Sequence, residues 1–97
     1  MARDSQAAQL RPALRVFALF GHPLRVMIFQ RLARAPASAG ELARSLPISR
    51  PAVVQHLKQL EGARLVGASL SGRRRIYRVQ RTGLAPLARW LAHHSRV

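Results

Sequence analysis

Apolar residues recur along the first two thirds of the chain at intervals of three and four positions, which is the spacing of a buried helix face. The pattern predicts four helices, over about residues 6–20, 23–35, 39–45 and 49–62. Pro12 lies inside the first helix, so we expect its ordered part to begin near Leu10, over 10–20, or to kink at the proline. The second helix is expected to turn four apolar residues inward: Leu24, Met27, Ile28 and Leu32.

Beyond about residue 64 the helical spacing gives way to short runs with β-branched and aromatic residues. Residues 65–70 and 75–79 are predicted strands, and Ser71–Gly72 supplies the turn of a hairpin between them. Thr82 is placed to cap a last helix over residues 83–94, in which Leu84, Leu87, Trp90 and Leu91 keep helical spacing. The predicted order is four helices, two strands and a helix.

Capping residues mark the ends of the two central helices. Ser38 and Glu41 have the spacing of a capping box, which satisfies two backbone amides at the start of the third helix. Ser49 is a natural N-cap for the fourth helix, and Gly62 is expected to end it near Ala63. Two short helices joined by three or four residues are typical of a helix-turn-helix.

The fourth helix carries the most informative pattern in the chain. Val53, Leu57 and Leu60 recur at i, i+4 and i+7 and form its buried stripe. The opposite side is a mixed row without a single acid: Arg50, Pro51, Val54, Gln55 and Lys58. A helix of this kind suits the major groove of DNA. About ten residues later, Ser71–Arg75 forms a basic hairpin tip, which would be the wing beside such a helix.

These elements predict a mainly α fold with a small β-hairpin, a winged helix-turn-helix of order α-α-α-α-β-β-α. We expect one domain over residues 1–97, because a chain of this length has room for one modest core. The recognition helix would span about 49–62 and the wing about 65–80.

The charge balance favours nucleic acid as the partner. The 97 residues include 17 Lys and Arg against 3 Asp and Glu, for a formal net charge of +14, and Lys58 is the single lysine. A chain this basic attracts a polyanion. The guanidinium group suits bidentate recognition of phosphate and guanine, although a GC-rich genome would also explain the ratio of Arg to Lys. It would not explain the shortage of acids.

Several classes of protein are disfavoured by what the chain lacks. There is no cysteine, which excludes disulfides, thiolate metal sites and thiol redox sensing. With three acids, no cysteine and no glycine-rich phosphate loop, few groups remain for catalysis, so we do not expect an enzyme. No apolar run approaches a membrane span, and Met1–Gln6 lacks the apolar core of a signal peptide, so we expect an intracellular protein without a membrane partner.

Four segments resemble those of a known family. Ala18–Ile28 is similar to its alanine-leucine–x–x–proline–x–arginine opening of the second helix, and Ala39–Ala43 to the "GELA" start of its third. Ser49–Leu60 is similar to its recognition helix, and Leu65–Val66 with Gly72–Tyr77 to its wing. The family is the ArsR family of bacterial winged-helix transcriptional repressors, and the resemblance runs from about Leu14 to Leu91. It implies a cytoplasmic, nucleoid-associated homodimer that binds a pseudo-palindromic operator.

The chain departs from the sensing half of that pattern. Metal sensors of the family use cysteines in or near the third helix, where this chain has Ala39, Gly40 and Glu41. Zinc and nickel sites on the last helix need Asp and well-spaced His, whereas His93 and His94 are adjacent here and point about 100° apart on a helix. The resemblance therefore supports DNA binding and repression, and we expect neither a metal nor a cofactor.

Each candidate DNA-contacting residue is expected to have a particular role. Arg50 and Gln55 are the expected base readers, because Arg pairs with guanine and Gln with adenine in the major groove. Lys58 is expected on phosphate, Pro51 and Val54 against thymine methyl groups, and Ser49 chiefly at its cap. On the wing, we expect phosphate or minor-groove contacts from Arg73, Arg74 and Arg75, since three adjacent cations repel one another without an anion.

Two aromatic side chains have open roles. Tyr77 could stack in the hairpin or bond a phosphate, and the sequence does not separate the two roles. His56 lies next to the buried stripe of the fourth helix, where a packed or phosphate-bonded histidine is expected rather than a pH switch.

Apolar residues on the first and last helices exceed what a small monomer core needs. They predict a dimer interface between helices 10–20 and 83–94, and the alternative is that they only close the monomer core. The residues are Leu10, Leu14, Phe17, Leu87, Trp90 and Leu91.

The sequence thus predicts a sequence-specific DNA-binding regulator, a homodimeric repressor that occludes a promoter and could regulate its own gene. A nonspecific, architectural nucleic-acid-binding protein remains an alternative, and a metal-responsive repressor is a weaker one. The operator sequence and any inducer cannot be read from the chain.

Overall fold

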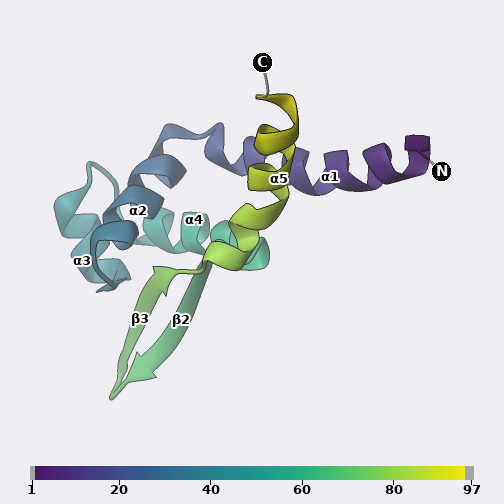
Figure 1. The fold of residues 1–97 in the computed structure, drawn as a ribbon. Helices are drawn as coiled ribbons and strands as arrows, with labels where there is room; N and C mark the ends of the chain where they lie inside the picture. Colours follow the sequence, from purple (N-terminus) through teal and green to yellow (C-terminus); the bar gives the residue numbers. More distant parts are fainter. Residues whose placement is uncertain (1, 96–97) are drawn as a thin grey trace.

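The computed structural model describes the backbone of residues 2–95 and the side chains of residues 8–95. Its elements, in chain order, are α1 (Ala2–Phe20), α2 (Pro23–Arg34), β1 (Ala37–Ser38), α3 (Ala39–Ser45), α4 (Arg50–Gly62), β2 (Val66–Ser71), β3 (Arg74–Val79), the 3-10 helix η1 (Arg81–Leu84) and α5 (Ala85–His94) (Figure 1). The predicted winged helix-turn-helix is confirmed, and the ends of the expected 1–97 domain lie outside the described residues.

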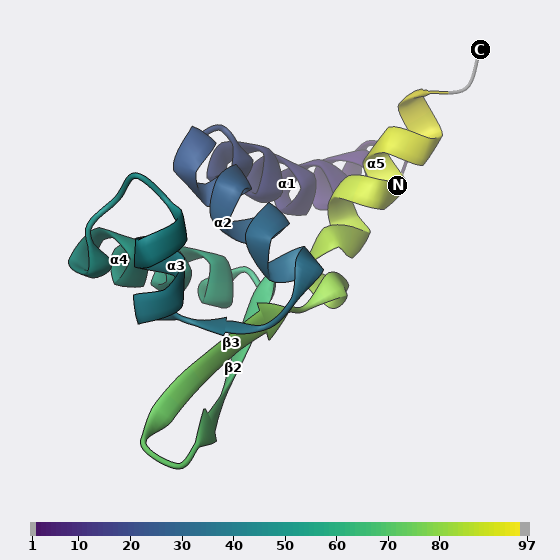
Figure 2. The ribbon, with the colours of Figure 1, turned by 90° about the vertical axis from the view of Figure 1, so that its left-hand side faces the viewer.

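The sheet has one strand more than the hairpin that the sequence predicts. Its three strands are antiparallel in the order β1-β3-β2. The extra strand pairs Ala37 with Tyr77 and Ser38 with Ile76, so the segment between α2 and α3 runs alongside β3 (Figure 2). The root of the wing is therefore hydrogen-bonded to the segment that leads into the helix-turn-helix.

The core lies between the helices and the root of the sheet. The predicted stripe of α4 is confirmed, because Val53, Leu57 and Leu60 are fully buried. Ile28 and Leu42 are equally inaccessible, as expected for the inward faces of α2 and α3. Met27 was expected inside and is exposed, because neighbouring helix positions point about 100° apart and Ile28 takes the inward direction.

The first helix is longer than the sequence predicts. It is helical from Ala2 to Phe20, with Pro12 inside it. The spacing predicted a helix over about 6–20, and Pro12 suggested either an ordered part from near Leu10 or a kink at the proline. Buried residues Ala13, Val16 and Leu19 follow Pro12 at helical spacing, so packing against the core stabilises the turns after the proline.

The caps of the two central helices are confirmed. The Ser38 hydroxyl accepts from the Glu41 amide at 3.2 Å and the Glu41 carboxylate accepts from the Ser38 amide at 3.3 Å, which completes the capping box of α3. Ser49 Oγ accepts from the Ala52 amide at the start of α4.

Helix α4 ends at Gly62 and Ala63 as the sequence predicts, but Gly62 does not take the left-handed conformation that usually favours glycine at a helix end. Gly62 is the last helical residue, but the left-handed position after the helix belongs to Arg64, at φ 59°. The Leu65 amide donates to the Leu60 carbonyl and the Arg64 amide to the Glu61 carbonyl, each at 3.0 Å, which are the two bonds of a Schellman motif. The buried pair Leu60 and Leu65 supplies the apolar contact that accompanies this motif.

Two further local predictions are wrong by small amounts. The hairpin turn is Gly72–Arg73 rather than Ser71–Gly72, and Gly72 takes the positive φ of 64° that such a turn requires. Thr82 does not cap the last helix; it lies in η1, and α5 begins after it without a side-chain cap.

The paired helices α1 and α5 and the β-hairpin lie at opposite ends of the fold. Helices α1 and α5 pack against each other, while the hairpin of β2 and β3 projects away from them beyond α3 and α4 (Figure 1). No single described helix is long and apolar enough to cross a bilayer; only the pair Ala8–Phe20 and Pro23–Arg34, bent by 94°, meets that requirement jointly.

Candidate nucleic-acid interface

The polar row of α4 lies on the surface, as the sequence predicts. Arg50, Gln55 and Lys58 are exposed, and within residues 8–95 none of these side chains hydrogen-bonds to the protein. Pro51 is exposed beside them, and Val54 is half-buried at the edge of the core. The row is therefore held on a helix whose other face is fully packed, and its three polar side chains remain available to a ligand.

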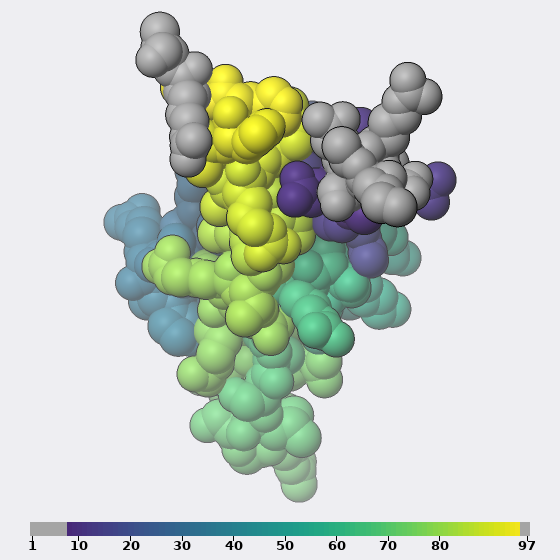
Figure 3. Space-filling model, turned by 45° about the vertical axis from the view of Figure 1, so that its right-hand side comes forward, coloured from purple at the N-terminus to yellow at the C-terminus, as the bar shows by residue number. Residues whose placement is uncertain are grey.

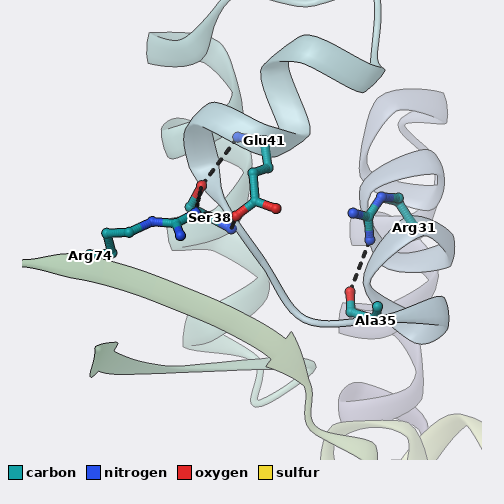
Figure 4. Close-up of polar contacts among 5 residues, drawn as sticks. All are labelled: Arg31, Ala35, Ser38, Glu41 and Arg74. Carbon is teal, nitrogen blue, oxygen red and sulfur yellow. Dashed lines mark hydrogen bonds and ion pairs between the residues drawn. The ribbon is translucent and has the colours of Figure 1, made fainter. Parts of the chain in front are cut away.

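Two of the three wing arginines are paired with carboxylates. Arg74 forms an ion pair with Glu41 and also approaches Ser38 Oγ at 3.4 Å (Figure 4). Arg75 donates to Glu61 at 3.1 Å, and its guanidinium lies 5.6 Å from the centre of the Tyr77 ring. The premise that these cations have no anion in the protein is thus wrong. Arg73, at the exposed turn, has no such pair within the described residues.

The ion pairs tie the wing to both helices of the helix-turn-helix. Glu41 lies in the first turn of α3 and Glu61 in the last turn of α4, so adjacent residues of β3 reach opposite ends of the motif. Hydrogen bonds from Ser38, with the nearby Arg74 guanidinium, hold the pKa of Glu41 below its usual value. Glu61 in turn raises the pKa of Arg75. The Glu41 carboxylate is thus held in its charged form.

A basic hollow of about 650 Å³ lies between the wing and the starts of α3 and α4. Five arginines line it: Arg44, Arg50, Arg73, Arg74 and Arg75. The hollow brings the expected base reader Arg50 together with the three wing arginines, Arg73, Arg74 and Arg75. Arg44 was not predicted as part of the site, because it stands alone near the end of α3 and no motif distinguishes it from other arginines.

Tyr77 is a core residue of the wing. Its side chain is only 5% exposed, and it sits on β3 opposite Ala37 and Ala68 of the neighbouring strands. Of the two roles left open by the sequence, packing in the hairpin is the one that this position fulfils. It also borders the basic hollow, so its contact with phosphate stays a prediction.

His56 faces α2 rather than the polar row. Its Nδ1 accepts from Arg25 Nε at 3.3 Å, and the His22 ring lies 4.5 Å away. Burial, followed by the neighbouring His22 and Arg25 charges, lowers its pKa. It is therefore a packed histidine that joins α2 to the recognition helix.

The predicted dimer residues divide into two groups. Phe17 and Trp90 meet edge-to-face at 5.3 Å within the monomer, and Leu87 packs against the core. Leu10, Leu14 and Leu91 are exposed, Leu14 to 51%, and Phe17 is as exposed as Leu10, at 40%. Leu87 and the contact between Phe17 and Trp90 help to close the monomer, and the exposed side chains leave an apolar patch on α1 and α5.

The adjacent histidines of α5 lie in an aromatic cluster with Trp90. His94 stacks on Trp90 at 4.3 Å, and its Nδ1 lies 3.0 Å from the Trp90 carbonyl. Among the described residues, no group of three or more His, Cys, Asp or Glu could hold a metal ion.

Comparison with known proteins agrees with this geometry. Residues 20–66 match the family model described as a helix-turn-helix domain. The chain is 57% identical over 63 residues to the HTH-type transcriptional regulator Rv2034 of Mycobacterium tuberculosis, and 41% identical over 63 residues to the HTH-type regulator MJ0229 of Methanocaldococcus jannaschii. These matches cover 65% and 61% of this chain but only 59% and 66% of the two relatives, so the chain spans just under two thirds of their lengths.

A solved structure extends the likeness to nearly the whole chain. The ArsR-like transcriptional regulator from Rhodococcus sp. RHA1 is 34% identical, with a TM-score of 0.80. The match covers 91% of this chain and 83% of that one.

Proposed function

Since the chain belongs to the ArsR family of winged helix-turn-helix transcriptional regulators, we propose that it is a homodimeric repressor that binds a pseudo-palindromic operator and occludes a promoter, its own included. It is a transcriptional regulator with a helix-turn-helix DNA-binding domain. The repression, the dimer and the operator are the parts that we propose.

The observation that carries the proposal is the exposed polar row of α4. Arg50 and Gln55 would read base edges, because their side chains are free and stand on a helix narrow enough for the major groove. Pro51 and Val54 would contact thymine methyl groups, Lys58 would contact phosphate, and Ser49 would hold the start of the helix. Each good base contact discriminates by about 1–3 kcal/mol against the wrong base.

The wing would bind the neighbouring backbone. Arg73 is free to do so directly, whereas Arg74 and Arg75 would share their guanidinium groups between a phosphate and the carboxylates of Glu41 and Glu61. Each guanidinium has five N–H donors, so an ion pair to one side leaves donors for the other. Contact by Tyr77 would be confined to the edge of its ring that borders the hollow.

The apolar patch supports a dimer. The exposed side chains of Leu10, Leu14, Phe17 and Leu91 would be buried against a second copy, next to the half-buried Trp90 and Leu87. A two-fold dimer places two recognition helices in successive major grooves about 34 Å apart, which is the reason for an operator of two inverted half-sites.

The deciding experiment starts from a selection of duplexes out of a random-sequence pool, followed by fluorescence anisotropy on the enriched site at about 150 mM salt. We expect an inverted repeat that binds at least about 10³-fold more tightly than a scrambled duplex. A pool without enrichment, or equal affinity for both duplexes, would instead identify a nonspecific architectural protein.

Two variants test the assigned roles. Gln55→Ala should relax the preference at one base position of each half-site. Lys58→Ala should weaken operator and scrambled DNA alike and make the log–log salt dependence shallower by about 0.9 for each phosphate that is no longer neutralised. Arg89→Ala, at an exposed position of α5, is the control for removal of charge alone and should leave the base preference unchanged. Sedimentation of wild type against Leu14→Glu tests the dimer.

A further inference from the structure

A second hollow lies where α1 meets the end of α4 and the start of α5. Its volume is about 500 Å³, within the range of small-molecule sites. It shares no residue with the DNA-contacting set proposed above. Figure 3 shows this side, with α1 in purple, the end of α4 in teal and α5 in yellow.

The lining combines positive charge with apolar surface. Arg11 and Arg15 come from successive turns of α1, and Arg64 comes from the left-handed residue after α4. Within residues 8–95 no carboxylate pairs with any of the three, because Glu41 and Glu61 are engaged by the wing. The walls between them are apolar, formed by Pro12, Val16, Ala63 and Pro86.

Two hydrogen bonds hold the rim of this hollow in place. Arg15 Nη2 donates to the Gly62 carbonyl at 3.0 Å, and the Gly83 amide donates to the Arg64 carbonyl at 3.0 Å. The Schellman motif places Arg64 between them. The three guanidinium groups are therefore carried by a frame that joins α1, the end of α4 and η1.

The hollow is separate from the apolar patch. Arg11 and Arg15 each follow a patch residue, Leu10 and Leu14, by one position, and successive helix residues point about 100° apart. A second copy of the chain bound to the patch would thus cover a different side of α1.

From this arrangement we infer that the hollow binds a small organic anion, a carboxylate or phosphate ester attached to an apolar body. The arginines supply charge-assisted hydrogen bonds to the anionic group, and the prolines, Val16 and Ala63 accept the apolar part. The inference concerns binding alone, and it stands or falls independently of the proposed repression.

Amide chemical shifts of the full chain, recorded by NMR during a titration with sodium benzoate at constant ionic strength, test the inference. We expect saturable shifts at Ala63, Arg64, Thr82 and Gly83, with a dissociation constant on the order of millimolar, as suits a small fragment. Benzyl alcohol has the same ring without the charge and should bind at least about tenfold more weakly.

Two variants and a matched control complete the test. Arg11→Gln should weaken benzoate binding about three- to tenfold. Arg64→Gly should do the same without harm to the fold, because glycine is favoured at positive φ. The control is Arg34→Gln, which removes an arginine from a smaller hollow of about 240 Å³ beside Met27. Equal binding of benzyl alcohol, equal weakening in the control, or shifts that never saturate would each overturn the inference.

Discussion

A methyl group at Gly83 would meet the backbone that ends the recognition helix. A Cβ atom built there lies 2.3 Å from the Arg64 carbonyl oxygen and 2.6 Å from that of Ala63, where real contacts essentially never fall below 3.0 Å. The two backbones must therefore separate by roughly 0.7 Å. They are also joined there, because the Gly83 amide donates to the Arg64 carbonyl at 3.0 Å.

The cost of Gly83→Ala follows from these contacts. Overpacking of this kind costs about 1–3 kcal/mol, and the strained hydrogen bond about 1 kcal/mol more. Alanine restricts the unfolded chain and returns about 0.4–1 kcal/mol. The net decrease in the free energy of unfolding is then about 1–3.5 kcal/mol, which lowers the melting temperature of a domain this size by about 5–25 °C.

Thermal unfolding followed by circular dichroism measures this decrease. Gly67→Ala is the matched control, since its Cβ would lie 3.6 Å from the Gln80 side chain, an ordinary contact. We expect the control to melt within a few degrees of wild type. If Gly83→Ala does so as well, the close approach of η1 to the end of α4 does not exist in solution.

Two other predictions concern charged side chains. Glu61→Gln removes the carboxylate that pairs with Arg75, so the affinity for nonoperator DNA should rise and the log–log slope of its salt dependence should steepen by about 0.9. An unchanged slope would show that the released Arg75 binds no phosphate. Folding lowers the pKa of His56 below its ordinary value of 6.5. Below pH 6.5 the unfolded chain therefore binds more protons than the folded one. The free energy of unfolding should then fall as the pH drops from 6.5 toward the lowered pKa. Urea unfolding of His56→Gln, which can still accept from Arg25, should lose this dependence, whereas exposed His93→Gln should keep it.

Local chemistry made much of the fold predictable. Ser38 and Glu41 cap α3 as expected, because a capping box involves residues three positions apart and little else. The stripe of Val53, Leu57 and Leu60 was equally clear, since it follows from helix geometry alone. Once this buried stripe is known, the same geometry predicts the exposed polar row on the opposite face of α4.

Contacts between distant residues could not be predicted in this way. Strand β1 has two residues, too few for a periodic pattern, and it exists because Ala37 pairs with Tyr77 forty residues later. The pairing of Glu41 with Arg74 joins residues 33 positions apart. The run of wing arginines therefore suggested free cations, although two of the three have carboxylate partners.

The left-handed residue after α4 shows a different limit. Gly62 was the residue that sequence rules favour for that position, but the helix continues through it and Arg64 adopts the positive φ instead. The burial of Leu65 against Leu60 decides where the chain turns, because it completes the Schellman motif in this register. Core packing thus overrides the preference of glycine.

Ser38 belongs to three parts of the molecule at once. It ends β1, caps α3 and lies beside the Arg74 guanidinium. Sequence changes near Ser38 leave little freedom to tilt the wing, because any tilt would also disturb the capped N-terminus of α3. Length changes at the tip, Gly72–Arg73, disturb none of these contacts. Evolution and protein engineering alike would therefore adjust the reach of this wing by insertion at its turn rather than by rotation at its base.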